Sequence, residues 1–137
     1  MAVKPIIHDE LSLKFKSLAA TKDDLEDAND LKDTLLANQG KAAGLAANMI
    51  GVQKRIIALF IGPLPILMLN PIITEKSEPY LAYEGCLSLT GERSTERFKT
   101  ITVKYQNENF ETRKQTFSDF TAEVIQHEID HCNGILI

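Results

Sequence analysis

The chain has 137 residues, 44% of them hydrophobic and 25% charged, which is the composition of one ordinary globular domain spanning residues 1–137. Its net charge is −4 and it has no basic block, so direct binding to nucleic acid or to a membrane is not expected. With only two cysteines and no signal peptide at the N-terminus, we expect a cytoplasmic protein rather than a disulfide-rich secreted one.

An N-terminal helix is predicted to start at Thr21 and to end at the turn formed by residues 38–40. Thr21 can cap it, with Asp24 three residues later and further acidic residues in the first turn. An apolar stripe with helical spacing follows, made of Leu25, Ala28, Leu31 and Leu35. Residues 1–20 are predicted to be irregular, apart from a short helical turn near residues 11–15.

The middle of the chain predicts β-strands. The small residues of 44–52 would let another backbone approach closely. Strands are expected at 55–60, 66–70 and 72–73, in a segment that glycine and three prolines break too often for a membrane span. Polar composition predicts loops at 75–79 and 90–96. Residues 100–105 and 110–117 alternate like the two arms of a hairpin.

A final helix is predicted to begin at Ser118 or Asp119 and to end at Asn133–Gly134. Its apolar contacts are expected from Phe120, Val124, Ile125 and Ile129. Because the strands lie between two helices rather than alternating with them, we expect an α+β fold. It would have a mostly antiparallel β-sheet around the C-terminal, metal-binding helix, together with the N-terminal helix.

The final helix carries the pattern His-Glu-x-x-His. His127 and His131 are four residues apart and therefore share one helix face, where two imidazoles can bind one metal ion. Glu128 stands beside them, where a base could take a proton from a water molecule. The alternative is a pair of buried histidines that are satisfied by hydrogen bonds.

A catalytic metal site needs a third ligand, and the candidates are His8, a carboxylate, Cys86 and Cys132. Cys132 follows His131 directly and points about 100° away around the helix, so we expect it to be a small buried hydrophobic residue. Cys86 is either a thiol of the core or the thiolate that completes a Cys/His/His set. Such a set suits Zn²⁺ or Fe²⁺ better than Mg²⁺ or Ca²⁺.

Three motifs together resemble the peptide deformylase family. They are Glu84-Gly85-Cys86-Leu87-Ser88, then residues 126–131, and, earlier in the chain, residues 42–49 as the counterpart of the family motif Gly-x-Gly-x-Ala-Ala-x-Gln. Their order and spacing agree with the family over nearly the whole chain. The resemblance implies a metal-dependent hydrolase that removes the N-formyl group from the N-terminal methionine of newly made polypeptides and releases formate.

Carried over by position, the resemblance implies a role for individual residues. Cys86, His127 and His131 would hold one divalent metal ion, foremost Fe²⁺, with Zn²⁺ or Ni²⁺ as alternatives. Glu128 would act as general acid and base. The backbone N–H of Leu87 would donate to the formyl oxygen as it gains charge.

The resemblance also implies partners. Gly44 would bind the N-formyl-methionyl peptide through its backbone in an extended conformation, Arg93 would contact the substrate, and the protein would associate transiently with the ribosome. We expect an apolar pocket for the methionine side chain, lined by Ala47, Tyr83, Ile125, His127 and Glu128. The sequence does not indicate an oligomeric state.

The chain departs from the family motif at two positions, Ala42 for glycine and Met49 for glutamine. In the family that glutamine amide helps to hold the formyl oxygen, whereas methionine has no N–H to donate. Gln53 and Asn48 are the nearby amides that could replace it. The departure motivates an alternative function, a weakened or inactive deformylase-like protein that binds metal and peptide N-termini.

Overall fold

The computed structural model describes residues 2–137 and contains a five-stranded sheet in which all neighbouring strands run antiparallel. The strand order follows the chain: β1 (Gly44–Ala46), β2 (Ile56–Ile61), β3 (Leu64–Gly85), β4 (Glu92–Gln106) and β5 (Thr112–Ser118). The α-helices are α1 (Glu10–Leu13), α2 (Leu25–Ala37) and α3 (Asp119–Cys132). The α+β prediction, with its mostly antiparallel sheet and C-terminal helix, is confirmed.

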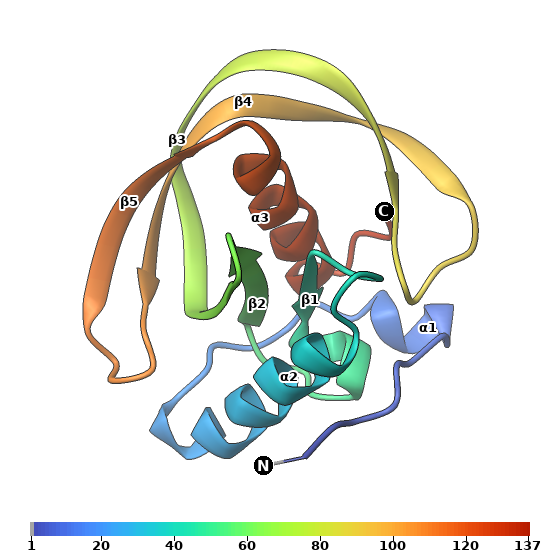
Figure 1. The fold of residues 1–137 in the computed structure, drawn as a ribbon, viewed down its shortest axis with the longest axis vertical. Helices are drawn as coiled ribbons and strands as arrows, with labels where there is room; N and C mark the ends of the chain where they lie inside the picture. The colour runs from blue at the N-terminus through green and yellow to red at the C-terminus, as the bar shows by residue number, and fades with distance from the viewer. Residues whose placement is uncertain (1) are drawn as a thin grey trace.

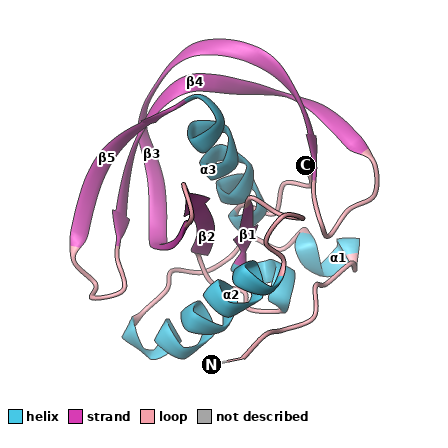
Figure 2. Cartoon of the chain, in the orientation of Figure 1, coloured by secondary structure: helices cyan, strands magenta, loops and turns pink. Residues whose placement is uncertain are grey.

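The sheet curves around α3. Figures 1 and 2 show the long strands β3 and β4 arching over this helix, while β1 and β2 lie along its other side and α2 packs at the base. The core between these layers includes Ile57, Met68, Ile101 and Ile125, all shielded from solvent. The strands of the sheet therefore enclose the metal-motif helix α3 on several sides.

Within residues 2–137, none of the helices combines the length and hydrophobicity needed to traverse a bilayer.

The N-terminal helix begins as its sequence predicts. The side chain of Thr21 accepts a hydrogen bond from the N–H of Asp23, and the carboxylate of Asp24 accepts one from the N–H of Thr21 at 2.8 Å. The first turn is a 3-10 helix, Lys22–Asp24, which leads directly into α2. Leu31 and Leu35 on its apolar stripe are fully buried, so the stripe attaches α2 to the sheet.

The two predicted loops at 75–79 and 90–96 are wrong over most of their length. Residues 75–79 belong to β3, where Pro79 pairs with Phe98 of β4, and residues 92–96 already belong to β4. The N–H and C=O of Phe98 bond to the amide of Gln126 rather than to β3, so proline at position 79 removes no ladder hydrogen bond. Strand pairing here overrides a local composition that favours a loop.

The final helix has the predicted boundaries, with Ser118 as N-cap and Asn133 as C-cap. The amide of Gln126 anchors it to β4 through Phe98. One prediction about this helix is wrong: the side chain of Phe120 is 64% exposed instead of making an apolar core contact. It lies in the first turn, beyond the part of α3 that the sheet encloses.

Candidate active site

The tertiary structure brings together the thiol of Cys86 and the imidazoles of His127 and His131. The three ligand atoms lie within 4.8 Å of one another, and the Sγ atom of Cys86 is 3.3 Å from Nε2 of His131. Cys86 follows the end of β3, whereas the histidines occupy successive turns of α3 and are buried. One thiolate and two imidazoles form a donor set that suits Fe²⁺ or Zn²⁺.

The two imidazoles differ in protonation. Burial lowers the pKa of His131 to about 4, so its ring is neutral at pH 7 and keeps a lone pair for a metal. Burial would also lower the pKa of His127, but hydrogen bonds with Cys86 and Glu84 outweigh it and raise the pKa to about 10. Metal binding at this cluster must therefore release a proton.

Glu84 orients His127. Its Oε1 atom accepts a hydrogen bond from Nδ1 of His127 at 2.8 Å, and Arg97 donates to both carboxylate oxygens at 2.7 and 2.9 Å. A second carboxylate, Asp130, accepts from the same guanidinium at 2.7 Å. Burial would raise the pKa of Glu84, but the bonds from His127 and Arg97 lower it to about 2, so it is ionised. A carboxylate in this position fixes the imidazole tautomer and leaves Nε2 for the metal.

Neither Glu84 nor Arg97 appears among the site residues expected from the sequence. For Glu84 a signal existed, because it lies two residues before Cys86 at the end of a strand. For Arg97 none did, since only the pairing of β3 with β4 and the packing of α3 place its guanidinium between Glu84 and Asp130.

Glu128 is buried next to the cluster. Its Oε1 atom has no hydrogen-bond partner among residues 2–137, and burial raises the pKa of this carboxyl group to about 7. It packs closely on β1: a Cβ atom at Gly44 would lie 3.2 Å from Cγ of Glu128 and 2.7 Å from Cγ1 of Val124. A carboxyl group with a pKa near neutrality can both accept and return a proton.

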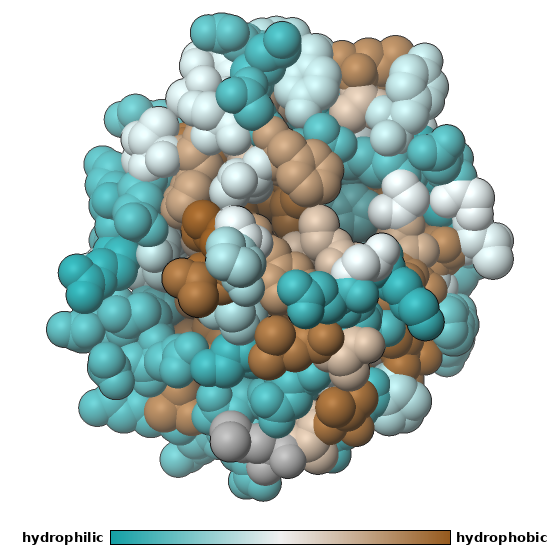
Figure 3. All heavy atoms as spheres, in the orientation of Figure 1, coloured by the Kyte–Doolittle hydropathy of each residue, from teal (hydrophilic) through white to brown (hydrophobic). Residues whose placement is uncertain are grey.

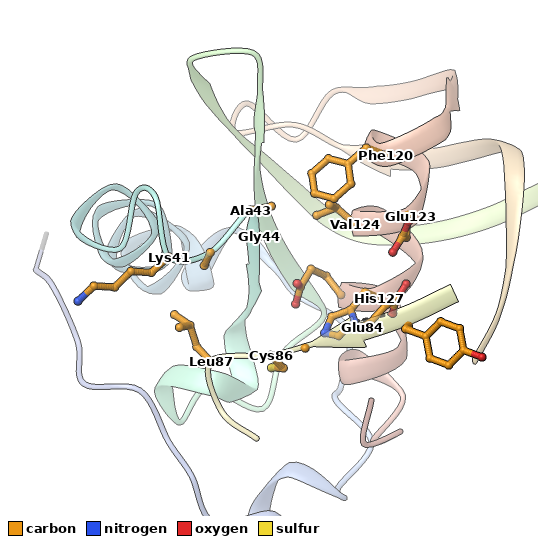
Figure 4. A pocket seen from close by; sticks show the side chains of 14 residues that line it. Lys41, Ala43, Gly44, Glu84, Cys86, Leu87, Phe120, Glu123, Val124 and His127 are labelled. Atoms are coloured by element: carbon orange, nitrogen blue, oxygen red, sulfur yellow. Dashed lines mark hydrogen bonds and ion pairs between the residues drawn. The ribbon is translucent and has the colours of Figure 1, made fainter. Parts of the chain in front are cut away.

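A cavity of about 470 Å³ opens beside Cys86, His127 and Glu128. Figure 4 shows Phe120, Val124 and His127 of α3 on one side, with Glu84 beside His127. Lys41, Ala43 and Gly44 lie on the other side, with Cys86 and Leu87 below. Apolar side chains gather around a hollow in the middle of the face drawn in Figure 3. The complete lining is Lys41, Ala42, Ala43, Gly44, Tyr83, Glu84, Gly85, Cys86, Leu87, Phe120, Glu123, Val124, His127 and Glu128.

The cavity includes some of the predicted substrate residues and not others. Gly44 and Leu87 line it, as does Tyr83. The expectation that Ala47 and Ile125 line a side-chain pocket is wrong, because both are packed in the core. Arg93 lies on β4 opposite Glu84, half-buried and outside the lining.

The side chain of Met49 is buried and turned toward the backbone of its own segment. Its sulfur accepts a hydrogen bond from the N–H of Ala46 at 3.4 Å. The amide of Asn48 donates to the carbonyl of His131 at 2.8 Å, and the amide of Gln53 donates to the carbonyl of Ser12 at 3.4 Å. Neither amide lines the cavity, so neither stands in for the glutamine of the family motif.

Comparisons with known proteins agree over most or nearly all of the chain. The family model for polypeptide deformylase matches residues 4–137. The chain is 52% identical to a peptide deformylase of Clostridium beijerinckii over 135 residues, which is 98% of this chain and 99% of the relative. A peptide deformylase of Dictyoglomus thermophilum is 40% identical over 80% of this chain and 71% of its own.

Solved structures show the same fold. A class I type b peptide deformylase of Acinetobacter baumannii, crystallised with Met-Ala-Ser bound, superposes with a TM-score of 0.88 at 31% identity, covering 99% of this chain and 97% of the other. A peptide deformylase of Thermotoga maritima superposes with a TM-score of 0.87 at 30% identity, covering 99% and 95%.

Proposed function

The chain belongs to the peptide deformylase family, and from this premise we propose which of its residues carry out the family's reaction. The protein is a metal-dependent hydrolase that removes the N-formyl group from the N-terminal methionine of newly made polypeptides and releases formate. Family membership does not favour the alternative of an inactive protein that only binds metal and peptide N-termini.

Cys86, His127 and His131 would hold the metal ion. The observation that carries this proposal is the convergence of their ligand atoms within 4.8 Å, at a cavity that Glu128 also lines. When bound, a divalent ion would lower the pKa of a water molecule and polarise the formyl carbonyl. We propose Fe²⁺ as the ion because of the family resemblance, although the donor set also suits Zn²⁺ or Ni²⁺.

Glu128 would move the proton that amide hydrolysis requires. In this role it takes a proton from the attacking water and returns it to the methionine nitrogen, so that formate leaves and a free amine remains. Support comes from its burial, its pKa of about 7 and its unpartnered Oε1 atom, all beside the metal cluster.

The remaining residues would bind and orient the peptide. The backbone N–H of Leu87 would donate to the formyl oxygen, and Gly44 in β1 would pair with the extended peptide, since β1 is an edge strand with one unpaired side. The apolar wall formed by Ala43, Phe120 and Val124 would take the methionine side chain. Because Arg93 is not in the cavity lining, it would contact only a part of the peptide that extends beyond the cavity.

The cellular setting is proposed from the substrate. Because N-formylated chains emerge during translation, we expect transient association with the ribosome and a cytoplasmic location. Residues 1–137 would form a single peptide-deformylase-like domain, to which both the middle and the last helix contribute metal ligands.

An assay for formate release tests the proposal. The purified protein is loaded with Fe²⁺ without oxygen, and formate release from formyl-Met-Ala is compared with that of Glu128→Ala. We expect turnover by the wild-type protein and a loss of at least about a hundredfold in the variant, in the range of general acid–base contributions. Equal rates in the two proteins would exclude Glu128 as the acid and base, and no formate from either would reject the proposed activity.

A further inference from the structure

His8 is a polar residue that neither the metal cluster nor the proposed reaction uses. The sequence makes it a candidate for the third metal ligand, but the ligand atoms that converge are those of Cys86, His127 and His131. Its side chain lies instead against the loop after β3, where Nδ1 of His8 is 3.1 Å from the carbonyl oxygen of Ser88. A carbonyl oxygen can only accept, so Nδ1 donates this hydrogen bond. In Figure 1, α1, which begins two residues after His8, lies beside the loop between β3 and β4.

The backbone on both sides of His8 is anchored. The N–H of Ile7 donates to the carbonyl of Met49 at 2.7 Å. On the other side, the carboxylate of Asp9 accepts from the N–H of Leu11 at 3.1 Å and caps α1. The ring of His8 is exposed, but its backbone has little freedom, which lowers the entropy cost of holding the side chain in one orientation.

The loop that His8 contacts is a tight turn at the metal cluster. The N–H of Ser88 donates to Sγ of Cys86 at 3.4 Å, and the N–H of Leu89 donates to the carbonyl of Cys86 at 3.4 Å. Leu87 lies between them in the chain and lines the cavity. Among residues 2–137 its N–H has no hydrogen-bond partner, unlike those of the two residues that follow it. The conformation of this turn therefore decides where the N–H of Leu87 points.

We propose that His8 is a positioning residue, whose hydrogen bond to the carbonyl of Ser88 fixes the turn of residues 86–89 and so aims the N–H of Leu87 at the formyl oxygen. The inference rests on the proposed role of Leu87 as an oxyanion donor. The N-terminal segment then joins two parts of the site that are distant in sequence, because its neighbouring bonds go to Ser88 and to Met49. A donor that is fixed before the reaction stabilises developing charge without reorganisation.

Two substitutions of nearly equal size separate the hydrogen bond from the rest of the side chain. His8→Asn keeps a nitrogen donor at the position of Nδ1, whereas His8→Asp places an acceptor oxygen there, opposite another acceptor. His8→Ala removes the group altogether. Glu10→Ala is the control for a general disturbance of the N-terminal segment, because Glu10 is exposed and lies two residues further on.

The first readout is amide hydrogen exchange in the metal-free protein, which does not depend on activity. The amides of Ser88 and Leu89 report on the turn because both are bonded within it. Since a single neutral hydrogen bond is worth roughly a factor of two to ten, we expect both amides to exchange at least about threefold faster in His8→Asp and His8→Ala. His8→Asn and Glu10→Ala should stay within about twofold of wild type. Exchange in α2 and α3 should not change, because local opening of the turn leaves them folded.

The second readout is turnover of formyl-Met-Ala by the Fe²⁺-loaded proteins. The oxyanion interaction strengthens in the transition state, so we expect kcat to fall by about three- to tenfold in His8→Asp and His8→Ala while KM stays the same. His8→Asn should keep at least about half of the wild-type kcat. These losses are smaller than the hundredfold or so for a deleted oxyanion donor, because the N–H of Leu87 remains and is only less well fixed.

Several results would overturn the inference. Wild-type exchange and kcat in His8→Asp and His8→Ala would do so, as would equal losses in His8→Asn and His8→Asp. Faster exchange throughout the chain, with a lower midpoint of thermal unfolding, would reduce His8 to a contributor to overall stability. Faster exchange of Ser88 and Leu89 with wild-type kcat would refute the link from the turn to the reaction. A wild-type protein without turnover would reject the proposed function, whereas the exchange rates would still decide whether His8 fixes the turn.

Discussion

The carboxylate of Glu84 accepts a hydrogen bond from Nδ1 of His127 at 2.8 Å, so Nε2 is the atom of that ring on the side of the metal cluster. This single contact joins β3 to α3 at the metal cluster. Arg97, only 4% exposed, holds the same carboxylate from β4. The direction of a ligand on the helix is therefore set by two strands of the sheet.

Glu84→Gln should weaken metal binding. The amide keeps one acceptor but presents an NH₂ group to Arg97 or His127, both of which are donors here. Losing such a partner of a ligand costs about 10- to 100-fold in metal affinity. Zn²⁺ competition measures the change, with Glu96→Gln as control because Glu96 is exposed and next to Arg97 in sequence. Equal effects of the two substitutions would contradict the role of Glu84.

Cys86→Ala should remove most of the bound metal, because it deletes the thiolate from a three-ligand cluster. Cys132→Ala is the matched control. Its thiol is buried, which raises its pKa to about 12 and keeps it protonated, so it should not serve as a ligand. Elemental analysis after anaerobic purification counts metal ions per chain. One ion per chain in Cys86→Ala would refute the assignment.

Met49→Gln should increase turnover, since it adds an amide donor where the family motif has one. The new Oε1 could accept the N–H of Ala46 that Met49 now takes, which leaves Nε2 as a donor that methionine lacks. Loss of one oxyanion donor typically costs about a hundredfold or more, so we expect a gain of about tenfold or greater in kcat. Met49→Leu, which adds no donor, should show no gain. An unchanged rate in Met49→Gln would mean that another group already supplies the bond.

Glu128→Gln should change how the stability of the metal-free protein depends on pH. Folding raises the pKa of Glu128 from 4.5 to about 7, so its protonated form is favoured in the folded state. That contribution is fully present below pH 4.5 and is lost as the pH rises through about 7. The size of the shift corresponds to about 3 kcal/mol at most.

Urea unfolding at pH 4.5 and pH 8 measures this loss. From pH 4.5 to pH 8, the unfolding free energy of the wild-type protein should decrease by more than that of Glu128→Gln, because glutamine cannot ionise. Parallel pH dependence in both proteins would show that Glu128 titrates normally in the folded state.

Gly44→Ala should impair the site by steric contact. The added Cβ would meet Cγ1 of Val124 at 2.7 Å and Cγ of Glu128 at 3.2 Å, so both side chains must shift. Overpacking of this kind costs about 1–3 kcal/mol of stability. Val124→Ala removes the nearest atom, so the double variant should regain stability relative to Gly44→Ala. No recovery in thermal unfolding would place the strain elsewhere, at the carbonyl of Ala58.

Local sequence patterns determined much of the secondary structure of this protein. The capped amphipathic helix at Thr21, the hairpin of β4 and β5 and the final helix were predictable because each depends on residues close together in the chain. His127 and His131 were predictable as a pair for the same reason, since helical spacing alone puts them on one face. Cys86 needed the family resemblance, because its position relative to α3 depends on the path of β3.

Only the tertiary structure decided what surrounds the metal motif. β3 runs without a break through residues 75–79, whose composition suggested a loop. Pairing with β4 outweighs that local preference. That pairing aligns Tyr80 and Glu84 along α3 and places Arg97 against Glu84, contacts between residues far apart in the chain. Burial among these elements, which no local pattern encodes, gives Glu128 a pKa near neutrality.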